Sequence, residues 1–95
     1  MAMNLNNNYR AALAQGTTLN KIEGKDILFS VKTGESFGLN EMAALMLSAL
    51  FSADSQTAVA KIAEEYAALP ADISQDLNEL VESLTAQKML TVESV

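Results

Sequence analysis

The spacing of apolar residues divides the chain into two parts. In the first part apolar and polar residues alternate, and the pattern is strongest where Ile27, Phe29 and Val31 would share one well-buried face of a strand. A Gly-containing turn segment stands on each side, Glu-Gly-Lys-Asp before it and Lys-Thr-Gly-Glu after it, as a tight hairpin requires. We therefore predict a meander of three antiparallel strands, over about residues 18–22, 27–31 and 36–39.

After these strands the apolar residues recur every three to four positions, which predicts helices. Asn40 is a favourable N-cap for the first helix, which is apolar over most of its circumference and should be the most buried. The third helix is the most clearly amphipathic, and Asp72 with Gln75 has the pattern of a capping box before it. The predicted helices cover residues 41–51, 57–68 and 73–87, and a short extended tail follows over residues 89–92.

The order of three strands and then three helices, with short connections, predicts one α+β domain over residues 17–95. Residues 1–16 are rich in asparagine and alanine; asparagine is a poor helix former, and the alanine-rich piece is too short to be stable alone. We expect residues 1–16 to form a mobile N-terminal arm. The alternative is an ordered turn packed on the domain or on a partner.

The composition disfavours catalysis. The chain has 95 residues, 49% of them hydrophobic, which suits one globular domain. It contains neither histidine nor cysteine, so the commonest general base, the thiol nucleophile and the usual transition-metal ligands are missing. Asp72, Asp76 and Glu79 share one stripe of the third predicted helix, which we interpret as a solvated face because one helix face supplies too few oxygens for a hard cation. We expect no catalytic activity, no cofactor and no metal.

The charge of the chain limits the classes of partner that it is expected to bind. The net charge is −6, and the six basic residues form no run, which disfavours binding to nucleic acids or to anionic membranes. The longest apolar segment, residues 42–51, is too short to span a bilayer, and the N-terminus lacks the apolar region of a signal peptide. Together with the absence of cysteine, these features favour a cytoplasmic protein.

Several segments, in this order and spacing, resemble the PqqD-like family. They are the apolar strand at 27–30, the Thr-Gly hairpin, the Leu39-Asn40 pair that opens a helix, the acidic pair before Tyr66, Asp76-Leu77 and Met89-Leu90. The resemblance extends over residues 19–92. Two departures are Lys88, where the family often has glycine, and the missing Pro-Glu that members serving pyrroloquinoline quinone synthesis have in the middle strand. The chain is therefore most similar to a standalone recognition element for another ribosomally made, modified peptide, such as a lasso peptide.

The resemblance implies a winged-helix-like fold and a function. Family members bind the leader segment of a precursor peptide as an added strand beside the third strand, in a groove closed by the third helix. They then deliver the precursor to a protease, a cyclase or a radical enzyme. The residues from 36 to 39 fit this role, because no Pro or Lys guards them and Gly38 leaves room for another backbone. The candidate peptide-binding residues are Ser36, Phe37, Gly38, Leu39, Leu77, Val81, Leu84, Thr85 and Lys88.

Among these candidates Val81 is the most specific prediction. It lies about 70° from the centre of the apolar face of its helix, so we expect the core to leave it partly free. Val81→Lys should then weaken peptide binding and leave the fold intact, whereas ordinary packing at the edge of the core is the alternative. Lys88 could meet an acidic side chain of the leader.

Two other functions stay open from the sequence. An acidic winged-helix transcriptional regulator would share the general shape, but the third predicted helix ends with a single lysine where a DNA reader needs several basic residues. A dimerising structural subunit would use the free strand edge on a second copy of itself, and the molecular mass in solution would separate it from a monomeric adaptor.

Overall fold

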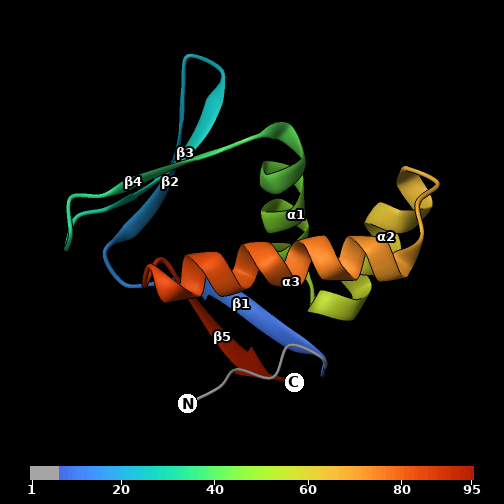
Figure 1. Cartoon of the computed structure of the whole chain (residues 1–95). Helices are drawn as coiled ribbons and strands as arrows, with labels where there is room; N and C mark the ends of the chain where they lie inside the picture. The colour runs from blue at the N-terminus through green and yellow to red at the C-terminus, as the bar shows by residue number, and fades with distance from the viewer. Residues whose placement is uncertain (1–6) are drawn as a thin grey trace.

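Two small antiparallel sheets and three helices make up the part of the chain that the computed structural model describes, residues 7–95 (Figure 1). The elements are β1 (Tyr9–Leu13), β2 (Thr17–Ile22), β3 (Lys25–Ser30), β4 (Ser36–Leu39), α1 (Glu41–Ser52), α2 (Ser55–Glu65), α3 (Pro70–Ala86) and β5 (Leu90–Ser94). One sheet has the order β2-β3-β4, and the other pairs β1 with β5. The predicted α+β class, the three-stranded meander and the three helices are confirmed.

The middle strand β3 turns the opposite face to the core from the one predicted. Leu28 is fully buried, whereas Ile27 and Phe29 are half-buried and Val31 is 69% exposed. The predicted face was wrong because β3 carries apolar residues on both sides, so the alternation alone cannot choose between them. In the structure Leu28 lies between Leu19 of β2 and Phe37 of β4. This row of three apolar side chains packs on the core.

The segment that was expected to be mobile contains β1. This strand pairs antiparallel with β5, from Tyr9 opposite Ser94 to Leu13 opposite Leu90. Tyr9 is only 2% exposed, and its backbone N–H donates to Ser55 Oγ at 3.0 Å. The prediction of a mobile arm is therefore wrong for β1, because its partner strand lies at the other end of the chain and local patterns do not show it. Residues 1–6 lie outside the described residues.

The residues at the N-terminal end of each helix explain where the helix begins. Asn40 precedes α1, and its side-chain oxygen accepts from the Ala43 N–H at 2.7 Å, which confirms the predicted N-cap. The second helix starts earlier than predicted because the Asp54 carboxylate accepts from the Thr57 N–H at 2.8 Å. The third also starts earlier, at Pro70, whose fixed φ suits the first turn. The predicted capping box before this helix was wrong, since its N-cap residue makes no side-chain bond.

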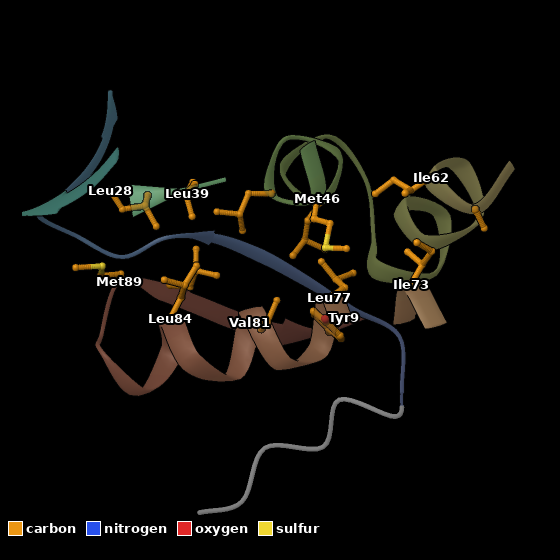
Figure 2. Close-up of a cluster of buried hydrophobic side chains, with 14 residues drawn as sticks. Tyr9, Leu28, Leu39, Met46, Ile62, Ile73, Leu77, Val81, Leu84 and Met89 are labelled. Carbon is orange, nitrogen blue, oxygen red and sulfur yellow. The ribbon is translucent and has the colours of Figure 1, made fainter. Parts of the chain in front are cut away.

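The core joins the inner face of the β2-β3-β4 sheet to α1, α3 and the β1-β5 ribbon. Figure 2 shows Leu28 and Leu39 of the sheet facing Leu84 and Met89. Leu39 ends β4 and is buried, so it fixes the position of this edge strand against the rest of the domain. The edge of β4 that faces away from β3 has no partner strand among residues 7–95.

A variant at Tyr9 tests how firmly β1 is held. Its hydroxyl donates to Asn78 Oδ1 at 2.9 Å, and burial raises the pKa of Tyr9 to about 12. Tyr9→Phe removes the bond and should lower the free energy of unfolding by about 1 kcal/mol at pH 7. A tyrosine in the unfolded chain ionises near pH 10, so the stabilisation by Tyr9 is complete below about pH 10 and is lost as the pH rises through 12.

The measurement is urea unfolding of both proteins at pH 7 and pH 11. We expect the advantage of the wild type over Tyr9→Phe to shrink at pH 11. An equal difference at both pH values would contradict the burial of this hydroxyl.

Candidate peptide-binding site

The free edge of β4 exposes backbone hydrogen-bonding groups in a regular pattern. The Ser30 N–H donates to the Glu35 carbonyl at 2.9 Å, so Ser30 at the end of β3 and Glu35 just before β4 form a hydrogen-bonded pair. In an antiparallel sheet such pairs alternate with pairs that are not bonded. Counted from Glu35, the next bonded residues are Phe37 and Leu39. Ser36 and Gly38 alternate with them and therefore turn their N–H and C=O groups away from β3. The edge offers four backbone groups to another chain.

The side chains along β4 leave this edge open. Ser36 and Gly38 are exposed, and a Cβ added at Gly38 would meet no atom within 4 Å. Phe37 is half-buried and Leu39 is buried, since both point to the inner face of the sheet. Natural edge strands usually carry a lysine or a proline that blocks pairing with another chain, but β4 has neither. All four predicted residues of β4 are thus placed at or behind an unguarded edge.

A hollow of about 370 Å³ lies next to the end of this strand, between the start of α1 and one flank of α3. Asn40, which follows the last residue of β4, forms part of its lining, and β4 leads directly into α1 (Figure 1). A chain that runs along the edge of β4 would therefore reach the hollow. Its lining consists of Asn40, Met42, Ala43, Met46, Asp76, Glu79, Leu80 and Ser83.

The predicted residues of α3 are distributed differently. Leu77, Val81 and Leu84 have no exposed surface, and Figure 2 shows them among the core side chains. The expectation that the core leaves Val81 partly free is wrong. The half-buried Thr85 uses its hydroxyl locally, donating to the carbonyl of Val81. None of these four residues, nor Lys88, lines the hollow.

Lys88 occupies a backbone position that favours glycine, the residue expected there from the family resemblance. It follows α3 with a φ of 62°, in the left-handed region that favours glycine. Its N–H donates to the Thr85 carbonyl at 2.9 Å, and the Met89 N–H donates to the Leu84 carbonyl at 2.9 Å. These two bonds form a Schellman motif, in which glycine is the usual residue at this position.

The β1-β5 ribbon decides which flank of α3 stays accessible. Tyr9 of β1 bonds to Asn78, and β5 packs against α3, so the flank with Asn78 and Val81 is covered. The other flank carries Leu80, which is half-buried, together with exposed acidic residues. The sequence does not indicate this flank, because Leu80 has the helical spacing of Leu77 and Leu84 and is expected to face the core with them.

Two other kinds of site can be checked in the part of the chain that the structure describes, a metal centre and a membrane-spanning helix. Residues 7–95 contain no group of three or more acidic side chains arranged to hold a metal ion. In the same region, no helix combines the length and the apolar character needed to cross a membrane. The open edge of β4 and the adjoining hollow are therefore the features to compare with known proteins.

The comparisons point to one family. The model of the family described as coenzyme PQQ synthesis protein D (PqqD) matches residues 27–90, which is more than half of the chain. Two solved structures share the fold. A lasso peptide synthetase B1 complexed with the leader peptide has a TM-score of 0.80 and 23% identity, covering 86% of this chain and 98% of its own.

The second structure, TbiB1 in complex with the TbiA(beta) leader peptide, has a TM-score of 0.74 and 22% identity, covering 82% of this chain and 92% of its own. No curated protein matches the chain significantly. At these identities the two structures show a shared fold, whereas the family match extends from the middle strand β3 to the start of β5. The chain therefore belongs to the PqqD family.

Proposed function

We propose that this chain is a non-catalytic adaptor that binds the leader segment of a ribosomally made precursor peptide and delivers the precursor to a modifying enzyme. The observation that carries the proposal is the open edge of β4 beside a hollow between α1 and α3. An extended peptide can add to such an edge as a further strand. The two similar structures are both complexes with leader peptides, which supports this class of ligand.

In this mode the leader forms a fourth strand next to β4. Ser36 and Gly38 present four outward backbone groups, which contribute about 2–6 kcal/mol at roughly 0.5–1.5 kcal/mol per bond. A micromolar complex needs about 8 kcal/mol, after the cost of association has been met. Side-chain contacts must supply the difference. Leu80 and Met42, the exposed methionine of the hollow, provide the apolar surface for them.

The role in delivery follows from what the chain lacks and from its family resemblance. Without histidine or cysteine, the chemistry would come from the partner, a protease, a cyclase or a radical enzyme. The partner would act on the precursor while its leader stays on β4. The cytoplasmic location expected from the sequence stays a prediction.

A titration tests the proposal. The purified chain is titrated in a calorimeter with the leader half of the precursor peptide encoded beside it, and separately with the core half. We expect one leader peptide to bind per chain with micromolar or tighter Kd, and the core half not to bind. Absence of leader binding at high micromolar peptide would contradict the proposed function.

The molar mass measured in the same samples separates the adaptor from a structural subunit. An adaptor with a free β4 edge is expected to be a monomer before the peptide is added. A stable dimer that dissociates when the edge is blocked would favour the subunit.

A further inference from the structure

The hollow beside β4 combines an apolar floor with an acidic rim. Met46 lies at its floor and is 3% exposed, and Leu80 is half-buried beside it. Asp76 and Glu79 line the same hollow from the exposed flank of α3. Asp76 lies one helical turn before Leu80, and Glu79 directly precedes it. Their carboxylates therefore stand at the solvent side of the apolar surface.

No positive charge balances this rim. The lining includes no lysine or arginine. Among the described residues, no basic side chain pairs with Asp76 or Glu79; their one side-chain hydrogen bond there runs from Gln75 Nε2 to Glu79 Oε1 at 3.4 Å. The chain as a whole carries a net charge of −6, so the wider surface does not reverse the sign of the field.

We propose that the hollow selects a leader peptide with a lysine or arginine at this point. The aliphatic part of that side chain would lie on Leu80 and the exposed Met42, above the buried Met46, and its cationic end would lie by Asp76 and Glu79. Long basic side chains bury their stems in this way while the charge stays in water. This inference rests on the proposed function and adds the chemical class of one leader side chain to it.

The geometry also places the basic residue within the leader. An added strand is expected to run antiparallel to β4, the more stable arrangement in a sheet that is already antiparallel. The hollow adjoins Asn40, just beyond the C-terminal end of β4. The basic residue should therefore stand on the N-terminal side of the leader segment that pairs with Gly38 and Ser36.

Two protein variants with the same change in charge test the proposal. Asp76→Asn combined with Glu79→Gln neutralises the rim, and Asp72→Asn combined with Glu82→Gln neutralises two exposed residues of α3 outside the hollow. The ligand is the leader half of the encoded precursor, titrated at low and at physiological salt. We expect the rim variant to bind about three- to tenfold more weakly at low salt, with a flatter salt dependence, and the control to change less than about twofold.

A matched set of peptides identifies the basic residue. Each lysine or arginine of the leader half is replaced in turn by glutamine, and one replacement should weaken binding to the wild type but not to the rim variant. Equal effects of the two protein variants, or tight binding of a leader without any basic residue, would overturn this inference and leave the proposed function intact. Failure of the leader half to bind the wild type would overturn both.

Discussion

Val81→Lys is expected to unfold the domain. The side chain of Val81 has no exposed surface and belongs to the core cluster with Leu77 and Leu84. An ammonium group placed there without a partner costs several kcal/mol, against a total stability of about 5–15 kcal/mol for a domain. Thermal unfolding followed by circular dichroism should show a Tm lower by about 15 °C or more, or no cooperative transition. This replaces the expectation from the sequence that the variant keeps its fold.

The neighbouring position supplies the control. Leu80 is half-buried and lines the hollow, so Leu80→Lys can hold its charge in water and is expected to keep a Tm much closer to that of the wild type. The same variant should lose most of its affinity for the leader, because it removes apolar surface and places a positive charge in the hollow. A wild-type Tm for Val81→Lys would contradict the packing of α3 described above.

Gly38→Pro is expected to weaken leader binding by at least about tenfold, because it removes an outward N–H and puts a ring in the path of the added strand. The fold should persist, since proline is tolerated on an edge strand when its nitrogen faces away from the neighbouring strand. Calorimetry with the leader half measures the affinity, and circular dichroism checks the fold.

Gly38→Ala is the matched control for this edge. It keeps the N–H, and its added Cβ would meet no atom within 4 Å, so the affinity should stay near that of the wild type. If proline and alanine had the same small effect, the leader would not pair with β4.

Much of the fold could be predicted from local signals. The change of period, the glycine turns and the Asn40 N-cap correctly predicted the meander and α1. The pairing of β1 with β5 could not be predicted, because residues 9–13 have a weak alternation and the partner lies at the other end of the chain. A two-stranded ribbon of this kind is stable only when it packs on other elements, here the helices.

The same ribbon explains why one half of the proposed site could be predicted from the sequence and the other half could not. The free edge at Ser36 and Gly38 follows from the order of the strands, which the sequence predicted and the structure confirms. The choice between the two flanks of α3 depends on which flank Tyr9 and β5 cover. Sequence periodicity placed Leu80 on the apolar face and Val81 on a flank that the core was expected to leave partly free, whereas in the structure Val81 is buried and Leu80 is the more accessible residue.

Backbone amide exchange of the chain with and without the leader half, read residue by residue by NMR, tests the central claim most directly. The N–H groups of Ser36 and Gly38 face the open edge, so their exchange should slow strongly when the leader binds. The N–H groups of Phe37 and Leu39 already face β3 and should change much less. Unchanged exchange at Ser36 and Gly38 in the bound state, or protection that appears on β1 or β5 instead, would contradict a leader strand added to β4.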